Sequence, residues 1–75
     1  MDRTDKRIIL TLAECDMNVT QTAQKLYMHR NSIVYHINRV KKKTGLNPLC
    51  FYDLCKLILE IETEGVETHD AETRT

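Results

Sequence analysis

Apolar residues recur every three or four positions along most of the chain, the spacing that places them on one side of an α-helix. The pattern is clearest between positions 30 and 43, where Ile33, Ile37 and Val40 form a single apolar stripe. The same spacing elsewhere predicts four helices in all, at residues 1–17, 19–26, 30–43 and 51–62. The other positions of the predicted core are Ile8, Ile9, Leu12, Ala13, Cys15, Ala23, Leu26, Phe51, Leu54, Cys55, Leu57, Ile58 and Ile61.

Residues that favour helix ends stand at the borders of these segments. The candidate N-caps are Asp2 or Thr4, then Asn18, then His29. Asn18 is followed three residues later by Gln21, which approximates a capping box. Gly45 can adopt the left-handed conformation that ends a helix, and Pro48 cannot continue one, so residues 46–50 are predicted to be a connector.

The size and composition of the chain favour a small helical fold. With 75 residues, two Gly, one Pro and no Trp, the sequence predicts one all-α domain, a bundle of about four helices over residues 1–62. Residues 63–75 have almost no apolar content and are expected to form a disordered acidic tail. No apolar run approaches the length of about 20 residues that spans a bilayer. We therefore expect no membrane association.

Charge is distributed unevenly although the formal net charge is zero. Residues 1–62 hold ten Lys or Arg and seven Asp or Glu, whereas residues 63–75 hold four acidic residues and one Arg. Between Lys25 and Lys43 there are six Lys or Arg and no acidic residue. Two helices joined by a tight turn across residues 18–45, with a cationic outer side, are typical of a helix-turn-helix that binds duplex DNA.

The outward side of the segment 30–43 gives the candidate base-reading residues. If Ile33 and Ile37 face inward, the outward positions are Arg30, Asn31, Val34, Tyr35 and Asn38. Arginine can donate two hydrogen bonds to guanine and asparagine can bridge an adenine edge, while valine can contact a thymine methyl group. Helix capping is the alternative role of Asn31 and of its neighbour Ser32.

Candidate phosphate contacts surround this side. They are Thr20, Gln21, Ser32, His36, Arg39, Lys41 and Lys43. Thr20 and Gln21 lie at the start of the second predicted helix, where backbone N–H groups suit an anion. The cluster Lys41–Lys43 has an alternative role as a solvated helix end that complements the helix dipole.

Three runs of residues carry a resemblance to a known family. They are H-R-N-S-I-V-Y-H-I-N-R-V at 29–40, T-G-L-N at 44–47 and N-V-T-Q-T-A-Q-K-L at 18–26. In these runs the chain resembles the C-terminal helix-turn-helix of PucR/CdaR-type bacterial transcriptional regulators, and more distantly the Fis-type DNA-binding domain. The resemblance covers residues 6–62. It implies a four-helix domain whose third helix enters the major groove, as the output module of a larger ligand-responsive regulator.

The sequence also departs from that family at two positions, and from helix-turn-helix turns in general at a third. The family usually has Arg where this chain has His36, and often Arg where it has Val34, which implies a reading face with less fixed charge. Tyr27 stands where the turn often holds Gly. A positive φ at Tyr27 would cost about 1 kcal/mol.

Other functions find less support in the sequence. The apolar face of residues 51–62, with Leu54, Leu57, Ile58 and Ile61, could bind another chain or form a homodimer; the domains of a parent protein could also do so. Phe51 and Tyr52 could stack on single-stranded nucleic acid, although packing at the helix entry is favoured. Neither a catalytic constellation nor a metal-ligand spacing is present, so we expect no enzyme activity, no metal, no cofactor and no small-molecule site.

Three cysteines, an odd number, favour free thiols rather than a disulfide framework. We expect Cys15, Cys50 and Cys55 to be buried or half-buried in a reducing compartment, with the protein in the cytoplasm.

Overall fold

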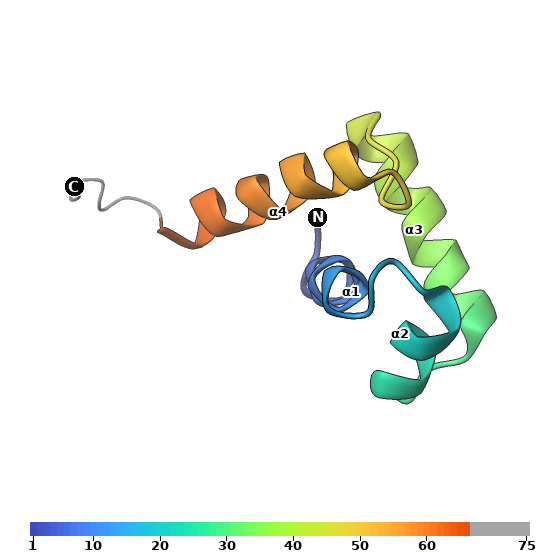
Figure 1. Cartoon of the computed structure of the whole chain (residues 1–75). Helices are drawn as coiled ribbons and strands as arrows, with labels where there is room; N and C mark the ends of the chain where they lie inside the picture. Colours follow the sequence, from blue (N-terminus) through green and yellow to red (C-terminus); the bar gives the residue numbers. More distant parts are fainter. Residues whose placement is uncertain (67–75) are drawn as a thin grey trace.

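A computed structural model describes residues 1–66, including the side chains of residues 1–63. It contains four helices: α1 (Arg3–Glu14), α2 (Val19–Lys25), α3 (Arg30–Thr44) and α4 (Phe51–Val66). Figure 1 shows α1 end-on at the centre, with α2 below it, α3 beside it and α4 above it. The prediction of a small all-α domain with about four helices is confirmed.

α1, α2 and α3 begin, and α3 also ends, at residues that the sequence singled out. Asp2 caps α1 through a capping box with Asp5, whose backbone N–H donates to Asp2 Oδ1 at 2.8 Å. Asn18 Oδ1 accepts from the Gln21 backbone N–H at 2.9 Å and caps α2. At the end of α3, Gly45 adopts a φ of 76°, in the left-handed region that glycine enters without a steric penalty. Local hydrogen bonds therefore fix the helix boundaries before any tertiary contact is counted.

Three residues outside the helices have a positive φ although they carry side chains. Tyr27 has a φ of 55° in the turn between α2 and α3, and its side chain is 96% exposed. Asp16 and Met17 have φ values of 54° and 65° between α1 and α2. The strain suspected at Tyr27 from its place in the turn is therefore present, at about 1 kcal/mol. It is offset by the packing of the helices on either side.

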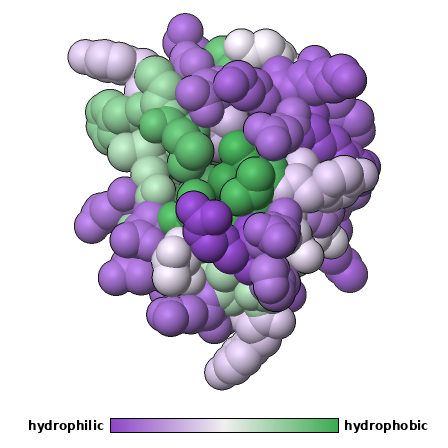
Figure 2. Space-filling view, turned by 90° about the vertical axis from the view of Figure 1, so that its right-hand side faces the viewer, coloured by the Kyte–Doolittle hydropathy of each residue, from purple (hydrophilic) through white to green (hydrophobic). Residues whose placement is uncertain are grey.

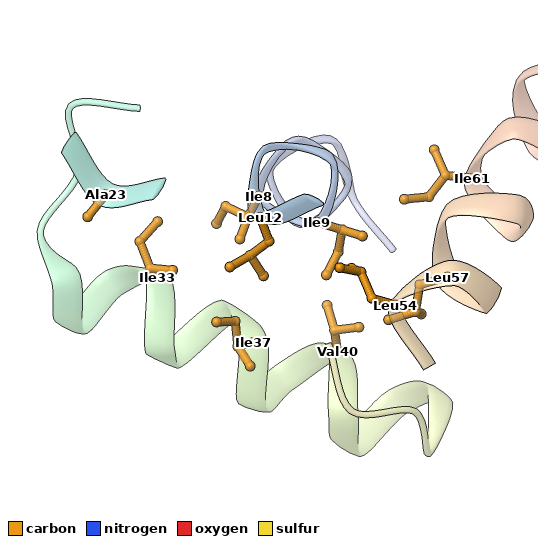
Figure 3. Close-up of a cluster of buried hydrophobic side chains, with 10 residues drawn as sticks. All are labelled: Ile8, Ile9, Leu12, Ala23, Ile33, Ile37, Val40, Leu54, Leu57 and Ile61. Carbon is orange, nitrogen blue, oxygen red and sulfur yellow. The ribbon is translucent and has the colours of Figure 1, made fainter. Parts of the chain in front are cut away.

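The core lies where α1 meets the other three helices. Its buried apolar side chains are Ile8, Ile9, Leu12, Ala23, Ile33, Ile37, Val40, Leu54, Leu57 and Ile61. Figure 3 shows Ile33, Ile37 and Val40 directed from α3 toward α1, and Leu54 and Leu57 close to Val40. α2 has only seven residues and would not be stable alone, so its place depends on Ala23 and Thr22, both buried. The apolar stripe predicted on α3 is confirmed.

α4 differs from its prediction in length and in the side that it buries. The helix continues to Val66 instead of ending near residue 62, and the Thr63 hydroxyl donates to the Leu59 carbonyl at 2.7 Å. Four residues assigned to a disordered tail are thus helical, since no proline or glycine cap stops the helix at 62. Residues 67–75 of that expected tail lie outside the described residues.

The apolar residues of α4 divide between the core and the surface. Leu54, Leu57 and Ile61 are buried, whereas Phe51 and Cys55 are exposed. The prediction that Phe51 and Cys55 belong to the core was wrong, because only one side of α4 reaches α1. The prediction also placed the thiols too deep in the protein. Cys50 is exposed like Cys55, and of the three cysteines Cys15 alone is half-buried.

A polar contact joins the start of α1 to the middle of α3. Asp5 is completely buried, and its Oδ1 atom lies 2.8 Å from His36 Nδ1. Arg39 contacts the carboxylates of both Asp2 and Asp5. Its Nη2 atom lies 2.9 Å from Asp2 Oδ2, and its Nε atom lies 3.7 Å from Asp5 Oδ2. A buried carboxylate is costly unless it is hydrogen-bonded and paired. Asp5 therefore stabilises one relative position of α1 and α3.

The pKa of the Asp2 carboxyl is lowered from its ordinary value, first because it accepts the hydrogen bond from the Asp5 backbone N–H. The positive charge of Arg39 acts in the same direction. A carboxyl with a lowered pKa in the folded state stabilises that state at neutral pH. This contribution is lost as the pH falls below about 4, through the lowered pKa.

Because α4 is divided between core and surface, replacing two leucines of this helix should lower the free energy of unfolding by unequal amounts. Leu57→Ala removes a side chain that is 0% exposed, and should lower the free energy of unfolding by about 2–5 kcal/mol. Leu59→Ala alters a side chain that is 63% exposed, and should change it by less than about 0.5 kcal/mol. Urea denaturation followed by circular dichroism measures both. Equal costs would contradict the placement of α4.

The buried carboxylate predicts a similar contrast between two acidic residues. Asp5→Ala leaves His36 without its partner and should lower the free energy of unfolding by about 1–3 kcal/mol. Glu14→Ala is the control, since it breaks an ion pair with Lys25 whose side chains are more than half exposed, and should cost less than about 1 kcal/mol. Urea titrations of the two variants under identical conditions give the comparison. A smaller loss for Asp5→Ala than for Glu14→Ala would refute the role given to Asp5.

Candidate nucleic-acid interface

The side of α3 opposite its buried stripe carries a row of exposed polar residues. Asn31, Tyr35 and Asn38 follow one another at intervals of four and three along this side, and Tyr35 is 61% exposed. Arg30 is exposed at the first position of the helix, and Val34 is half-buried beside the row. The five predicted base-reading residues therefore lie together on one accessible side of α3. We call Arg30, Asn31, Val34, Tyr35 and Asn38 the reading face.

The N-terminal end of the reading face is fixed by a histidine cap. His29 Nδ1 accepts a hydrogen bond from the Asn31 backbone N–H at 3.0 Å. The cap is therefore supplied by His29, as predicted, and the Asn31 side chain makes no hydrogen bond within residues 1–63. The alternative role of Asn31 as a cap does not apply. Its amide group can face a ligand.

Lysines extend the reading face toward the C-terminal end of α3. Lys41, Lys42 and Lys43 are all exposed, and no carboxylate of the described residues lies within salt-bridge distance of them. With Arg30 at the other end, the outer side of α3 carries positive charge at both ends. α3 itself contains no acidic residue. A surface with positive charge and without acidic groups attracts a polyanion more strongly than a surface that mixes acidic and basic groups.

A shallow hollow of about 310 Å³ lies along the middle of α3. Tyr35, Asn38, Arg39 and Lys42 line it. Lys42 was not among the predicted site residues, because it points away from Lys41 and Lys43. It follows Tyr35 by seven residues, which is two helical turns, and that spacing could have identified it.

Two predicted phosphate contacts are directed elsewhere. His36 was expected on the outer side of α3, but its side chain is 16% exposed and is paired with the buried Asp5. Arg39 is 34% exposed and is held by Asp2. In the structure both side chains hold α3 against α1, His36 at the buried carboxylate of Asp5 and Arg39 mainly at Asp2, and their contact with phosphate stays a prediction. Arg39 still borders the hollow.

The remaining predicted contacts are accessible. Thr20 and Gln21 are exposed at the start of α2, and Ser32 is half-buried in the first turn of α3. The backbone N–H of Gln21 already donates to Asn18, so this donor is not available for a ligand there. The anion site expected from the helix N-terminus is weakened accordingly.

Figure 2 looks onto the side of the molecule where α3 lies outermost. Hydrophilic residues cover most of this view, and hydrophobic residues form a patch that runs from its upper left part to its centre. Within residues 1–63 the structure shows no group of three or more His, Cys, Asp or Glu side chains that could hold a metal ion. No helix in the described part of the chain is long and apolar enough to cross a membrane.

Comparison with known proteins gives one match. The family described as the PucR C-terminal helix-turn-helix domain matches residues 7–62. No curated protein and no solved structure matches the chain. The matched segment contains most of α1 and all of α2 and α3, and it ends within α4. This chain therefore belongs to the PucR C-terminal helix-turn-helix family, whose members are DNA-binding modules of transcriptional regulators.

Proposed function

We propose that this domain binds duplex DNA in a sequence-specific manner, with α3 in the major groove and the reading face against the base edges. The observation that carries the proposal is the exposed side of α3, where polar side chains are flanked by cations and acidic groups are absent. The major groove admits an α-helix, and each base pair presents a distinct hydrogen-bonding pattern there. The domain then performs no chemistry. Its activity is recognition.

Within the reading face, each residue type suits a particular base. Arg30 can donate two hydrogen bonds to a guanine, and Asn31 can pair with the edge of an adenine. Val34 can contact a thymine methyl group, while Tyr35 and Asn38 extend the contact into the hollow of α3. Because Arg30 and Asn31 lie at the N-terminal end of α3, they would enter the groove most deeply.

Phosphate binding then falls mainly to the lysines. Lys41, Lys42 and Lys43 are accessible, and Ser32, Thr20 and Gln21 can add neutral hydrogen bonds. Arg39 can contribute only from its position beside Asp2, which neutralises part of its charge. Lysines act on phosphates as point charges, so affinity should depend strongly on salt while the reading face decides sequence.

Family membership places this activity in a regulator. We infer that the domain is the output module of a bacterial transcriptional regulator and acts in the cytoplasm, where it reaches DNA. The alternative of an interaction module built on Leu54, Leu57, Ile58 and Ile61 loses support, because three of these side chains are buried in the core and Ile58 is half-buried against it.

Selection of bound sites from random duplex DNA tests the proposal. The domain should enrich a short motif, and Asn31→Ala should relax specificity at one position, with a loss of about 1–3 kcal/mol of discrimination. Asn47→Ala, a change in the connector between α3 and α4, should leave the motif unchanged. If wild-type protein enriches no motif, the sequence-specific function is refuted.

A salt series separates phosphate contacts from base contacts. On a duplex with a single site, Lys42→Ala should weaken binding to all sequences and reduce the slope of log K against log salt by about one. Lys56→Ala removes the same charge from an exposed position on α4 and should leave the slope unchanged. Fluorescence anisotropy at several salt concentrations measures both. An unchanged slope for Lys42→Ala would remove Lys42 from the interface.

A further inference from the structure

Asp2 places a carboxylate beside the outer side of α3. Its Oδ2 atom accepts a hydrogen bond from Arg39 Nη2 at 2.9 Å, and both side chains of this ion pair are partly exposed. Arg39 also lines the hollow on the outer side of α3, together with Tyr35, Asn38 and Lys42. A negative charge therefore stands next to a surface that we propose to face the phosphates of DNA.

The charge of Asp2 also acts on Lys43. Arg39 and Lys43 are four residues apart, so they lie about one turn apart on the same side of α3. The hydrogen bond from the Asp5 backbone N–H has the largest effect on the pKa of the Asp2 carboxyl, and the positive charges of Arg39 and Lys43 add to its lowering. Coulomb interaction is mutual. The Asp2 carboxylate therefore weakens the positive potential around two of the predicted phosphate contacts.

Negative charge is in excess where α1 meets this side of α3. Arg39 is shared by two carboxylates, since its Nε atom also lies 3.7 Å from Asp5 Oδ2. Two negative charges and one permanent positive charge leave one negative charge in excess when His36 is neutral. Asp5 is completely buried, whereas the Asp2 side chain is 46% exposed. Asp2 is thus the member of this cluster whose charge reaches the solvent beside α3.

The capping role of Asp2 can be separated from its charge. Asp2 caps α1 through Oδ1, which accepts from the Asp5 backbone N–H at 2.8 Å, while Oδ2 faces Arg39. Asparagine keeps an acceptor oxygen and is as good an N-cap as aspartate. An exposed ion pair contributes little to stability. The fold therefore does not require a negative charge at position 2.

We propose that Asp2 limits the affinity of this domain for DNA, by offsetting the charges of Arg39 and Lys43 where a phosphate approaches α3. This inference rests on the proposed function. Phosphate contacts act on every sequence alike, whereas contacts with base edges specify the sequence. The Asp2 carboxylate therefore weakens binding to all duplexes by a similar factor. The choice of sequence stays with the reading face.

Fluorescence anisotropy of Asp2→Asn tests the proposal, on the selected motif and on an unrelated duplex of the same length. Because this variant uncovers positive charge, it should bind both duplexes about three- to tenfold more tightly at low salt. The slope of log K against log salt should become steeper by up to about one, because more counterions are released. The gain should shrink as salt is added, since salt screens the charge at position 2.

Glu14→Gln is the matched control. It also converts a carboxylate to an amide and frees a cation from an exposed ion pair, in which Lys25 Nζ lies 2.9 Å from Glu14 Oε1. Neither residue belongs to α3 or lines its hollow. The control should therefore change the affinity by less than about twofold. Circular dichroism and urea denaturation should show that both variants are folded and similar in stability.

The possible failures can be told apart. An unchanged affinity for Asp2→Asn would overturn the role of Asp2, as would an equal gain for Glu14→Gln. Asp2→Ser also keeps a capping oxygen and should reproduce the gain, and it decides the test if Asp2→Asn is unfolded. A wild-type domain that binds duplexes without enriching a motif would refute only the sequence-specific function. A wild-type domain that binds neither duplex would overturn both proposals.

Discussion

The packing of Ile33, Ile37 and Val40 against α1 decides which side of α3 faces outward. A helix whose apolar residues are spaced by four and three has one stable rotation about its axis, since turning it would expose them. The reading face is therefore a consequence of the core rather than a separate construction. Asp5 adds a polar condition to this packing, because its buried carboxylate is paired only when the side of α3 that carries His36 and Arg39 lies opposite it. Apolar packing sets the rotation of α3, and the Asp5 contact holds α3 at one point along α1.

Most of this frame could be predicted from the sequence because its signals are local. Asn18, His29 and Gly45 act within a few residues of their own positions, and each acts as its chemistry predicts. The inward stripe of α3 is likewise contained in the spacing of its residues. The contact of His36 with Asp5 could not be predicted in this way, because the two residues lie 31 positions apart in the chain. Spacing tells which residues share a side of a helix, but it does not tell which other helix that side meets.

The same limit explains why the buried side of α4 could not be predicted. Its apolar residues cover more than half of the helix surface, so the sequence could not show which part reaches the core. Leu54, Leu57 and Ile61 are buried there and Ile58 packs against them in part, because α1 touches α4 on one side. The prediction assigned Phe51 and Cys55 to the interior on hydrophobicity alone. Burial is a property of the neighbour as much as of the residue, and that information is absent from a single helix pattern.

The division of charge around α3 connects the fold to the proposed function. Asp2 and Asp5 lie against the flank that carries His36 and Arg39, so the cationic charge of that flank serves the contact with α1. The charge left for a polyanion comes from Arg30 and the lysines at the end of α3. A single domain then has few strong phosphate contacts, and its affinity for DNA should be modest at physiological salt.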